Sequence, residues 1–197
     1  QLLINLNASP YHMNKMVERK EMLRKRSEAA KLPIIYANLV GGQDELVFDG
    51  GSMATDANGN CQLLAPSFVE GLYPVVVELP EFDKASCNIP QQSIAEHIEL
   101  EADIYQALVL GVRDYVNKNG FKGVVLGLSG GIDSALTLAI AVDALGKGRV
   151  QAVMMPFEYT SELSLEAAQQ QATTLGVAYR IISIADIYAA FMSALTD

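Results

Sequence analysis

The sequence has 197 residues, half of them apolar, and a formal net charge of −9. A chain of this size and apolar content is expected to bury a core, in one domain or in two small ones. Its acidic balance argues against general nucleic-acid binding, which needs basic surface to neutralise phosphates. No apolar run approaches the ~20 residues of a membrane span and no signal peptide is visible, so we expect a cytoplasmic protein.

Single residue types add little to this. Cys61 and Cys87 lack the spacing of metal ligands, and we expect free thiols. His12 and His97 are isolated, which favours surface or structural roles. The chain opens on QLLINLN without an initiator Met, as if in the middle of a strand, so we expect a fragment of a longer protein.

The first 80 residues combine strand and helix signals. Residues 1–7 are predicted to form a buried strand, and residues 15–31 an exposed amphipathic helix. The apolar face of that helix carries Met16, Met22, Leu23 and Ala30. Further strands are expected at 33–40, 45–48, 52–56, 61–65 and 73–79. The pair Asn58-Gly59 predicts a hairpin between two of them.

The second half alternates regularly between strands and helices. A proline-containing linker near residues 81–95 separates a domain at 1–80 from one at 96–197. A long helix is expected from Ile94 to the Asn119-Gly120 stop. Strands follow at 123–128, 150–155 and 178–184, and helices at 133–145, 161–175 and from 186. Such repeats predict an α/β fold with a Rossmann-like parallel sheet, whose ligands bind at the carboxyl ends of the strands.

The turn after the first of these strands carries the strongest chemical signal. The stretch GLSGGIDS (127–134) joins an apolar strand to a helix, where free backbone N–H groups and the helix dipole favour an anion. Glycines allow close approach of the backbone, and Ser129 and Ser134 add hydroxyl groups. Asp133 would repel phosphates unless a cation lay between them, which points to Mg²⁺ with a nucleotide polyphosphate.

Simpler interpretations of this turn stay open. Ser129 or Asp133 could be a plain helix cap. The turn is not a Walker A loop, because no G-x-x-x-x-G-K-[ST] is present, and it breaks the G-x-G-x-x-G dinucleotide pattern. Met154, Met155 and Pro156 end the second strand, where contact with a ligand and plain core packing are about equally expected for the methionines. Thr160 and Ser161 are expected to be helix caps.

SGGIDS (129–134) resembles the pyrophosphate-binding loop of the ATP pyrophosphatases, which adenylate an oxygen of their substrate. The first half, with NLNASPY (5–11) and LPIIYANLVGGQDELVFDGGSMATDANG (32–59), resembles the C-terminal half of a nitrilase-like amidase domain, an α-β sandwich. This pairing, together with MMPFEYTSELSLEAA (154–168), is similar to the glutamine-dependent NAD synthetases. The resemblance covers nearly the whole chain.

The resemblance implies a ligase that uses ATP and Mg²⁺ to amidate deamido-NAD, with ammonia from glutamine hydrolysis, and that forms homo-oligomers. It implies ATP contacts at Gly127, Leu128, Ser129, Gly130, Gly131, Ile132, Asp133, Ser134 and Met155, with Asp133 as the metal ligand. It implies glutamine contacts at Ser9 and Lys15. The family's glutaminase Cys, Glu and Lys are expected upstream of this chain, which should therefore be inactive alone.

Two rival functions remain. One is a non-catalytic nucleotide-binding module with a degenerate amidase lobe. The other is a Rossmann oxidoreductase with Glu158 on a ribose, which Asp133 and the broken glycine pattern disfavour.

Overall fold

The computed structural model describes residues 1–79 and 87–195. It divides into two compact units, residues 1–111 and 112–197, and the division falls within a helix, α2 (Leu100–Lys118). Residues 81–86 of the linker predicted at 81–95 lie outside the described residues, and the predicted domain limits (1–80 and 96–197) stay predictions. No helix among the described residues is long and apolar enough to cross a membrane.

The first unit is built on a mixed sheet. Its strands are β1 (Leu3–Asn7), β2 (Ile34–Asn38), β5 (Met53–Thr55) and β6 (Cys61–Leu64), in that spatial order. β1 runs parallel to β2, whereas β5 and β6 are antiparallel to their neighbours. A separate hairpin joins β3 (Val40–Gln43) and β4 (Leu46–Asp49). The hairpin predicted at Asn58-Gly59 connects β5 to β6 and is confirmed.

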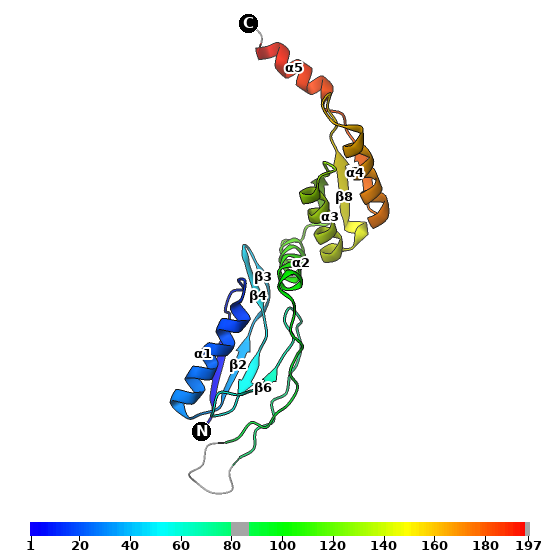
Figure 1. The fold of residues 1–197 in the computed structure, drawn as a ribbon. Helices are drawn as coiled ribbons and strands as arrows, with labels where there is room; N and C mark the ends of the chain where they lie inside the picture. The colour runs from blue at the N-terminus through cyan, green and yellow to red at the C-terminus, as the bar shows by residue number, and fades with distance from the viewer. Residues whose placement is uncertain (80–86, 196–197) are drawn as a thin grey trace. The chain divides into compact units, whose positions relative to one another are not determined.

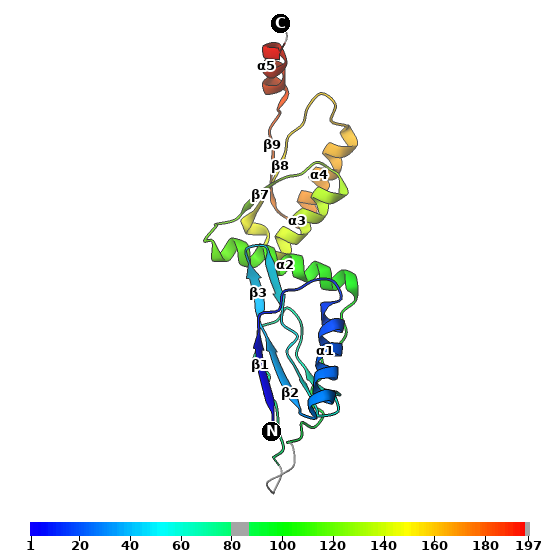
Figure 2. The ribbon, with the colours of Figure 1, turned by 90° about the vertical axis from the view of Figure 1, so that its left-hand side faces the viewer.

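The two faces of this sheet are covered differently. On one face lies α1 (Lys15–Ala30), beside β1 and β2 in Figures 1 and 2. Leu23 of the helix packs there against Ile34, Tyr36, Met53 and Leu64. Because side chains alternate along a strand, Ile35, Ala54 and Leu63 point to the other face, where they meet Ile89 and the chain near Val75 and Val77.

Four sequence predictions in this unit were wrong. β1 is not buried: Ile4 and Leu6 are 64% and 80% exposed, and among the described residues β1 is an edge strand that pairs with β2 alone. The amphipathic helix α1 is confirmed, with Leu23 buried and Met16 packed beside it, but its apolar face was wrong at Met22 and Ala30, which are exposed. The other buried residues of α1 are Arg19 and Ser27.

The other two errors concern a strand that does not form and the start of a helix. Residues 73–79 form no strand, only a single bridge from Glu78 to Asn88. The helix predicted from Ile94 begins at Leu100, because residues 93–95 pair alongside β6 through hydrogen bonds to both backbone groups of Leu64.

The second unit contains the predicted parallel sheet. β7 (Val124–Gly127), β8 (Val150–Met154) and β9 (Ala178–Ile181) lie in chain order and are all parallel. The connecting helices, α3 (Ile132–Leu145) and α4 (Glu162–Leu175), cover the same face of the sheet (Figure 2). A short 3-10 turn, η1 (Lys147–Arg149), precedes β8, and α5 (Ala185–Leu195) follows β9. The predicted α/β class is confirmed.

A compact apolar core fixes where the loops of this unit lie. Leu128, Leu138, Ala152 and Ala168 are at most 1% exposed and come from the β7–α3 turn, α3, β8 and α4. Leu128 therefore anchors the turn that follows β7 to the interior. The residues after Leu128 are held at the carboxyl edge of the sheet.

Candidate functional site

The turn from β7 to α3 passes directly beside the start of α4. Gly130 has a φ of +81°, a conformation that side chains disfavour. A Cβ built on Gly130 would lie 2.3 Å from the carbonyl oxygen of Ser164. Only glycine fits between the turn and α4, and this contact fixes the height of the turn above the sheet.

Hydrogen bonds within the turn hold its shape. The Ser134 hydroxyl accepts from the Ser129 N–H (3.2 Å) and donates to the Gly131 carbonyl (3.0 Å). The Ser129 hydroxyl oxygen lies 3.0 Å from that of Ser134 and accepts from the Gly131 N–H at 3.3 Å. All these bonds join residues at most five positions apart, so the turn is organised by its own sequence.

The first turn of α3 is left open for a ligand. Its N-cap is Gly131, which has no side chain to cap the helix. The N-cap position predicted for Ser129 or Asp133 is taken by Gly131, although the Ser129 hydroxyl does accept from the Gly131 N–H. Ser129, Gly131, Ile132 and Asp133 are all exposed. The free N–H groups of α3, with the helix dipole, face solvent where an anion can bind.

Asp133 suits a magnesium ion that is also held by phosphates. Within the described residues, no group of three or more His, Cys, Asp or Glu residues could hold a metal by itself. Mg²⁺ needs few protein ligands, because one or two carboxylates with phosphate oxygens and water complete its shell. The exposed carboxylate at the start of α3 fits that requirement.

A cavity of about 270 Å³ adjoins the turn at the carboxyl ends of β7 and β8. Its lining residues are Gly127, Leu128, Ser129, Met154, Met155 and Thr160. Met154 is 3% exposed and belongs to the core, which agrees with the alternative of plain core packing for this methionine. Met155 is 50% exposed, and its Cε lies 3.2 Å from where a Cβ of Gly127 would stand. Pro156 accepts a backbone hydrogen bond from Ile184.

The expected caps of α4 hold in part. Ser161 is the N-cap, and its hydroxyl accepts from the Ser164 N–H at 3.2 Å. Thr160 instead accepts from the Phe157 N–H at 2.9 Å and also lines the cavity. The sequence did not predict that Thr160 lines the cavity, because its place there depends on how residues 155–160 turn back towards β7.

Ser9 and Lys15, the residues of the implied glutamine site, lie in the first unit. Ser9 follows the carboxyl end of β1 and is partly buried. Lys15 is the first residue of α1, and its Nζ lies 3.7 Å from Glu18 Oε2. His12 is exposed, with its Nε2 3.4 Å from the same carboxylate. The roles of Ser9 and Lys15 remain predictions.

A buried polar cluster beside Ser9 has no counterpart in the sequence analysis. Arg19 and Asp49, each 2% exposed, form a two-pronged ion pair with both N–O distances at 3.0 Å. The guanidinium carbon also lies 5.9 Å from the centre of the Tyr36 ring. The only signal in the sequence was an arginine on the predicted apolar face of a helix.

Tyr11 fixes the chain on the other side of Ser9. Its hydroxyl donates to Asp103 Oδ2 at 2.7 Å, and its ring packs edge-on against Phe68. Burial, aided by the hydrogen bond to Asp103, raises the pKa of Tyr11 well above its usual value. Tyr11 therefore serves as a neutral hydrogen-bond donor at physiological pH.

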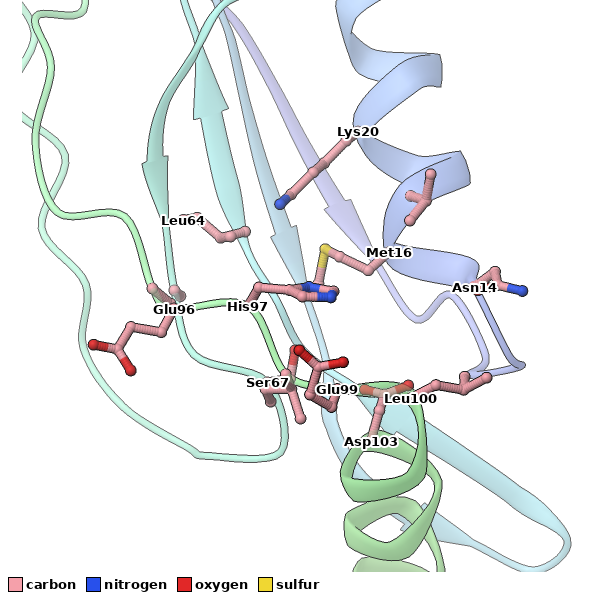
Figure 3. Close-up of a pocket in the computed structure, with 14 residues that line it drawn as sticks. Asn14, Met16, Lys20, Leu64, Ser67, Glu96, His97, Glu99, Leu100 and Asp103 are labelled. Atoms are coloured by element: carbon pink, nitrogen blue, oxygen red, sulfur yellow. The ribbon is translucent and has the colours of Figure 1, made fainter.

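A separate pocket of about 220 Å³ lies between α1 and the start of α2 (Figure 3). Lys20 reaches over it from α1, His97 and Glu99 line it from the chain that leads into α2, and Asp103 lines it from the first turn of α2. Its charges are of both signs and most are exposed. It therefore favours no single class of ligand.

The fold and the turn place the second unit in the Rossmann-like α/β class, with an anion-suited turn at the carboxyl edge of its sheet. Residues 104–197 match the family model of NAD synthase. The chain is 46% identical over 195 residues to the glutamine-dependent NAD(+) synthetase of Acinetobacter baylyi, a match that covers 99% of this chain and 35% of that protein. It is 40% identical over 219 residues to the enzyme of Aquifex aeolicus, covering 98% of this chain and 39% of the other.

A solved structure extends this likeness to three dimensions. The glutamine-dependent NAD+ synthetase of Acinetobacter baumannii, in complex with ADP, superposes with a TM-score of 0.87 at 49% identity, covering 98% of this chain and 36% of that chain. The resemblance to glutamine-dependent NAD synthetases is confirmed over nearly the whole chain. The chain spans about a third of the length of these relatives.

Proposed function

We propose that this chain forms part of a glutamine-dependent NAD synthetase. Such an enzyme is a ligase that uses Mg-ATP to amidate deamido-NAD, releases AMP and pyrophosphate, and takes its ammonia from glutamine. The observation that carries the proposal is the uncapped start of α3 beside the exposed Asp133. The relative from Acinetobacter baumannii was solved with ADP, which supports a nucleotide as the ligand of this turn.

The roles follow from the chemistry of a carboxylate, which is a poor acyl donor because oxide is a poor leaving group. Adenylation divides the difficult substitution into two easier steps. Ser129, Gly130, Gly131 and Ser134 would hold the phosphates through N–H and hydroxyl groups, and Asp133 would ligate Mg²⁺. The metal, when bound, neutralises the charge that develops on the departing pyrophosphate.

The remaining contacts complete the proposed nucleotide site. Gly127, Leu128, Met155 and Thr160 line the cavity beside the turn, and we assign it to the nucleoside part of ATP. Ile132 would contribute through its backbone, because its side chain is 80% exposed at the start of α3.

We further propose that Ser9 and Lys15 contact glutamine, and that the nucleophile of glutamine hydrolysis lies outside residues 1–197. Neither cysteine here suits that role. Cys87 is 6% exposed with its thiol bonded to the carbonyl of Gln1, and burial raises the pKa of the Cys61 thiol, which disfavours the reactive thiolate. Both are free thiols, as predicted. Homo-oligomer formation, which the resemblance implies, and a cytoplasmic location are likewise proposals.

The test removes one charge at a time from the full-length protein that carries this chain. Asp133→Asn keeps the shape of the side chain and should lower ammonia-dependent AMP and NAD formation by on the order of 10²-fold. The matched control is Glu166→Gln, an exposed carboxylate on α4, which should leave the rate unchanged. Undiminished activity of Asp133→Asn would refute the assignment of the turn. Mg-ATP binding without any AMP formation by the wild-type protein would instead indicate the non-catalytic nucleotide-binding module.

A further inference from the structure

Ser9 is held through its backbone by two buried side chains. Its N–H donates to Asn38 Oδ1 at 2.9 Å, and its carbonyl accepts from Arg19 Nη2 at 3.5 Å. Asn38 and Arg19 are 9% and 2% exposed, so neither can move without disturbing the core. Both backbone groups of one partly buried residue are thus bound to distant parts of the unit.

The two supporting side chains are in turn joined to each other. The carbonyl of Gly50 accepts from Arg19 Nη1 at 3.2 Å and from Asn38 Nδ2 at 3.0 Å. Gly50 can present this carbonyl because its φ is +68°, and a Cβ there would lie 2.5 Å from Cγ2 of Val40. Asp49 then fixes the Arg19 guanidinium.

Asn38 suits this position for a chemical reason. Its amide accepts from Ser9 with the oxygen and donates to Gly50 with the nitrogen, and only an amide side chain of this size can do both. A carboxylate would lose the donor, and an apolar side chain would lose both bonds.

Stability alone does not account for the cluster. A buried ion pair costs about as much in desolvation as it gains in attraction, and apolar side chains of similar volume are often as stable. Arg19 Nε is buried and has no hydrogen-bond partner within the described part of the chain, which adds a further cost. What the cluster supplies is a fixed geometry at Ser9.

We propose that Asn38 and Arg19 are positioning residues for the glutamine site: they hold Ser9 in place without touching glutamine themselves. The inference rests on the proposed role of Ser9. A misplacement of about 1 Å at a binding group can cost on the order of 10²-fold in rate, so loss of this support should be visible in the kinetics.

The experiment compares two routes to NAD in the full-length protein that carries this chain. Asn38→Ala should raise the KM for glutamine by roughly tenfold, yet leave NAD formation from added ammonia unchanged. The matched control is Ser27→Ala. Ser27 is a buried residue of α1, eight positions after Arg19, and its hydroxyl lies 2.6 Å from that of Thr55 rather than bonding Ser9, Asn38 or Arg19. It should lower the melting temperature but leave the KM for glutamine within about twofold.

The possible outcomes separate the inference from the proposed function. An unchanged KM in Asn38→Ala, or an equal rise in Ser27→Ala, would overturn the positioning role. If Asn38→Ala does not fold, the same KM measurement is made on Arg19→Lys and judged by the same criterion. This variant keeps the charge but loses the two-pronged geometry. Ser9→Ala is the third arm: if it leaves the KM unchanged, the proposed role of Ser9 itself fails. If it raises the KM while Asn38→Ala does not, only the inference fails.

Discussion

Replacing Gly130 by alanine tests whether the turn after β7 is fixed by its contact with α4. The added Cβ would lie 2.3 Å from the Ser164 carbonyl oxygen and 2.7 Å from its Cα. Both are backbone atoms of α4, so no flexible side chain can move aside. Either the turn or the helix has to shift.

The expected cost has two parts. The positive φ of Gly130 disfavours alanine by roughly 1–2 kcal/mol. Overpacking against a rigid neighbour adds about 1–3 kcal/mol. We therefore expect a destabilisation of roughly 2–5 kcal/mol and, because the turn is displaced, a loss of Mg-ATP affinity of at least about tenfold.

Two other glycines of the same unit serve as controls that separate the conformational cost from the overpacking cost. Gly146 has a similar φ of +78° with no atom within 4 Å of a built Cβ, so Gly146→Ala measures the conformational cost alone. Gly148 has neither a positive φ nor a close neighbour, and Gly148→Ala gives the baseline.

Hydrogen exchange of the β8 amides reports the opening free energy of this unit, and calorimetry reports nucleotide affinity. If Gly130→Ala matched Gly146→Ala in both measurements, the contact between the turn and α4 would have no energetic role.

Three further changes probe other parts of the chain. Leu138→Ala, at a fully buried site, should lower the opening free energy by about 2–5 kcal/mol in the same exchange measurement; a loss below 1 kcal/mol would contradict the packing. Tyr11→Phe, which leaves Asp103 without its donor, should cost about 1 kcal/mol in urea unfolding, and no change would contradict that bond. Burial alone would raise the pKa of Asp56, but hydrogen bonds from Asn60 and its neighbours lower it overall. The stabilisation by the Asp56 carboxylate is therefore complete above its ordinary pKa of 3.8 and is lost as the pH falls through its folded-state pKa. Asp56→Asn should remove this contribution to the pH dependence of the free energy of unfolding in acid, and an unchanged pH dependence would contradict it.

The second unit was predictable from sequence because its signals are local. An apolar run, a glycine turn and a 3.6-residue periodicity each span a few residues, and their regular alternation allows few topologies. The strands and helices from residue 123 onwards are confirmed with limits shifted by a few residues.

The errors in the first unit share the opposite cause. Residues 73–79 have strand-like composition, but Val75 and Val77 pack onto the sheet without joining its hydrogen-bond ladder. Ile94 fits a helical pattern, yet its backbone neighbours bond to Leu64, 30 residues away. Partners so distant in sequence leave no trace in a local window, and tertiary contacts decide the outcome.

The two proposed sites also differ in whether local or long-range contacts shape them, and they should therefore respond differently to substitutions in the core. The nucleotide turn is shaped by bonds across at most five residues, so its motif could be recognised in the sequence. The support of Ser9 joins residues 10 and 29 positions away, through buried side chains of another strand and a helix. No motif search would find Asn38 or Arg19, because their roles depend on the packed sheet rather than on neighbours in the chain. For the same reason, loosening the core around β2 and α1 disturbs Ser9 directly, whereas the nucleotide turn depends mainly on its own residues and on Ser164.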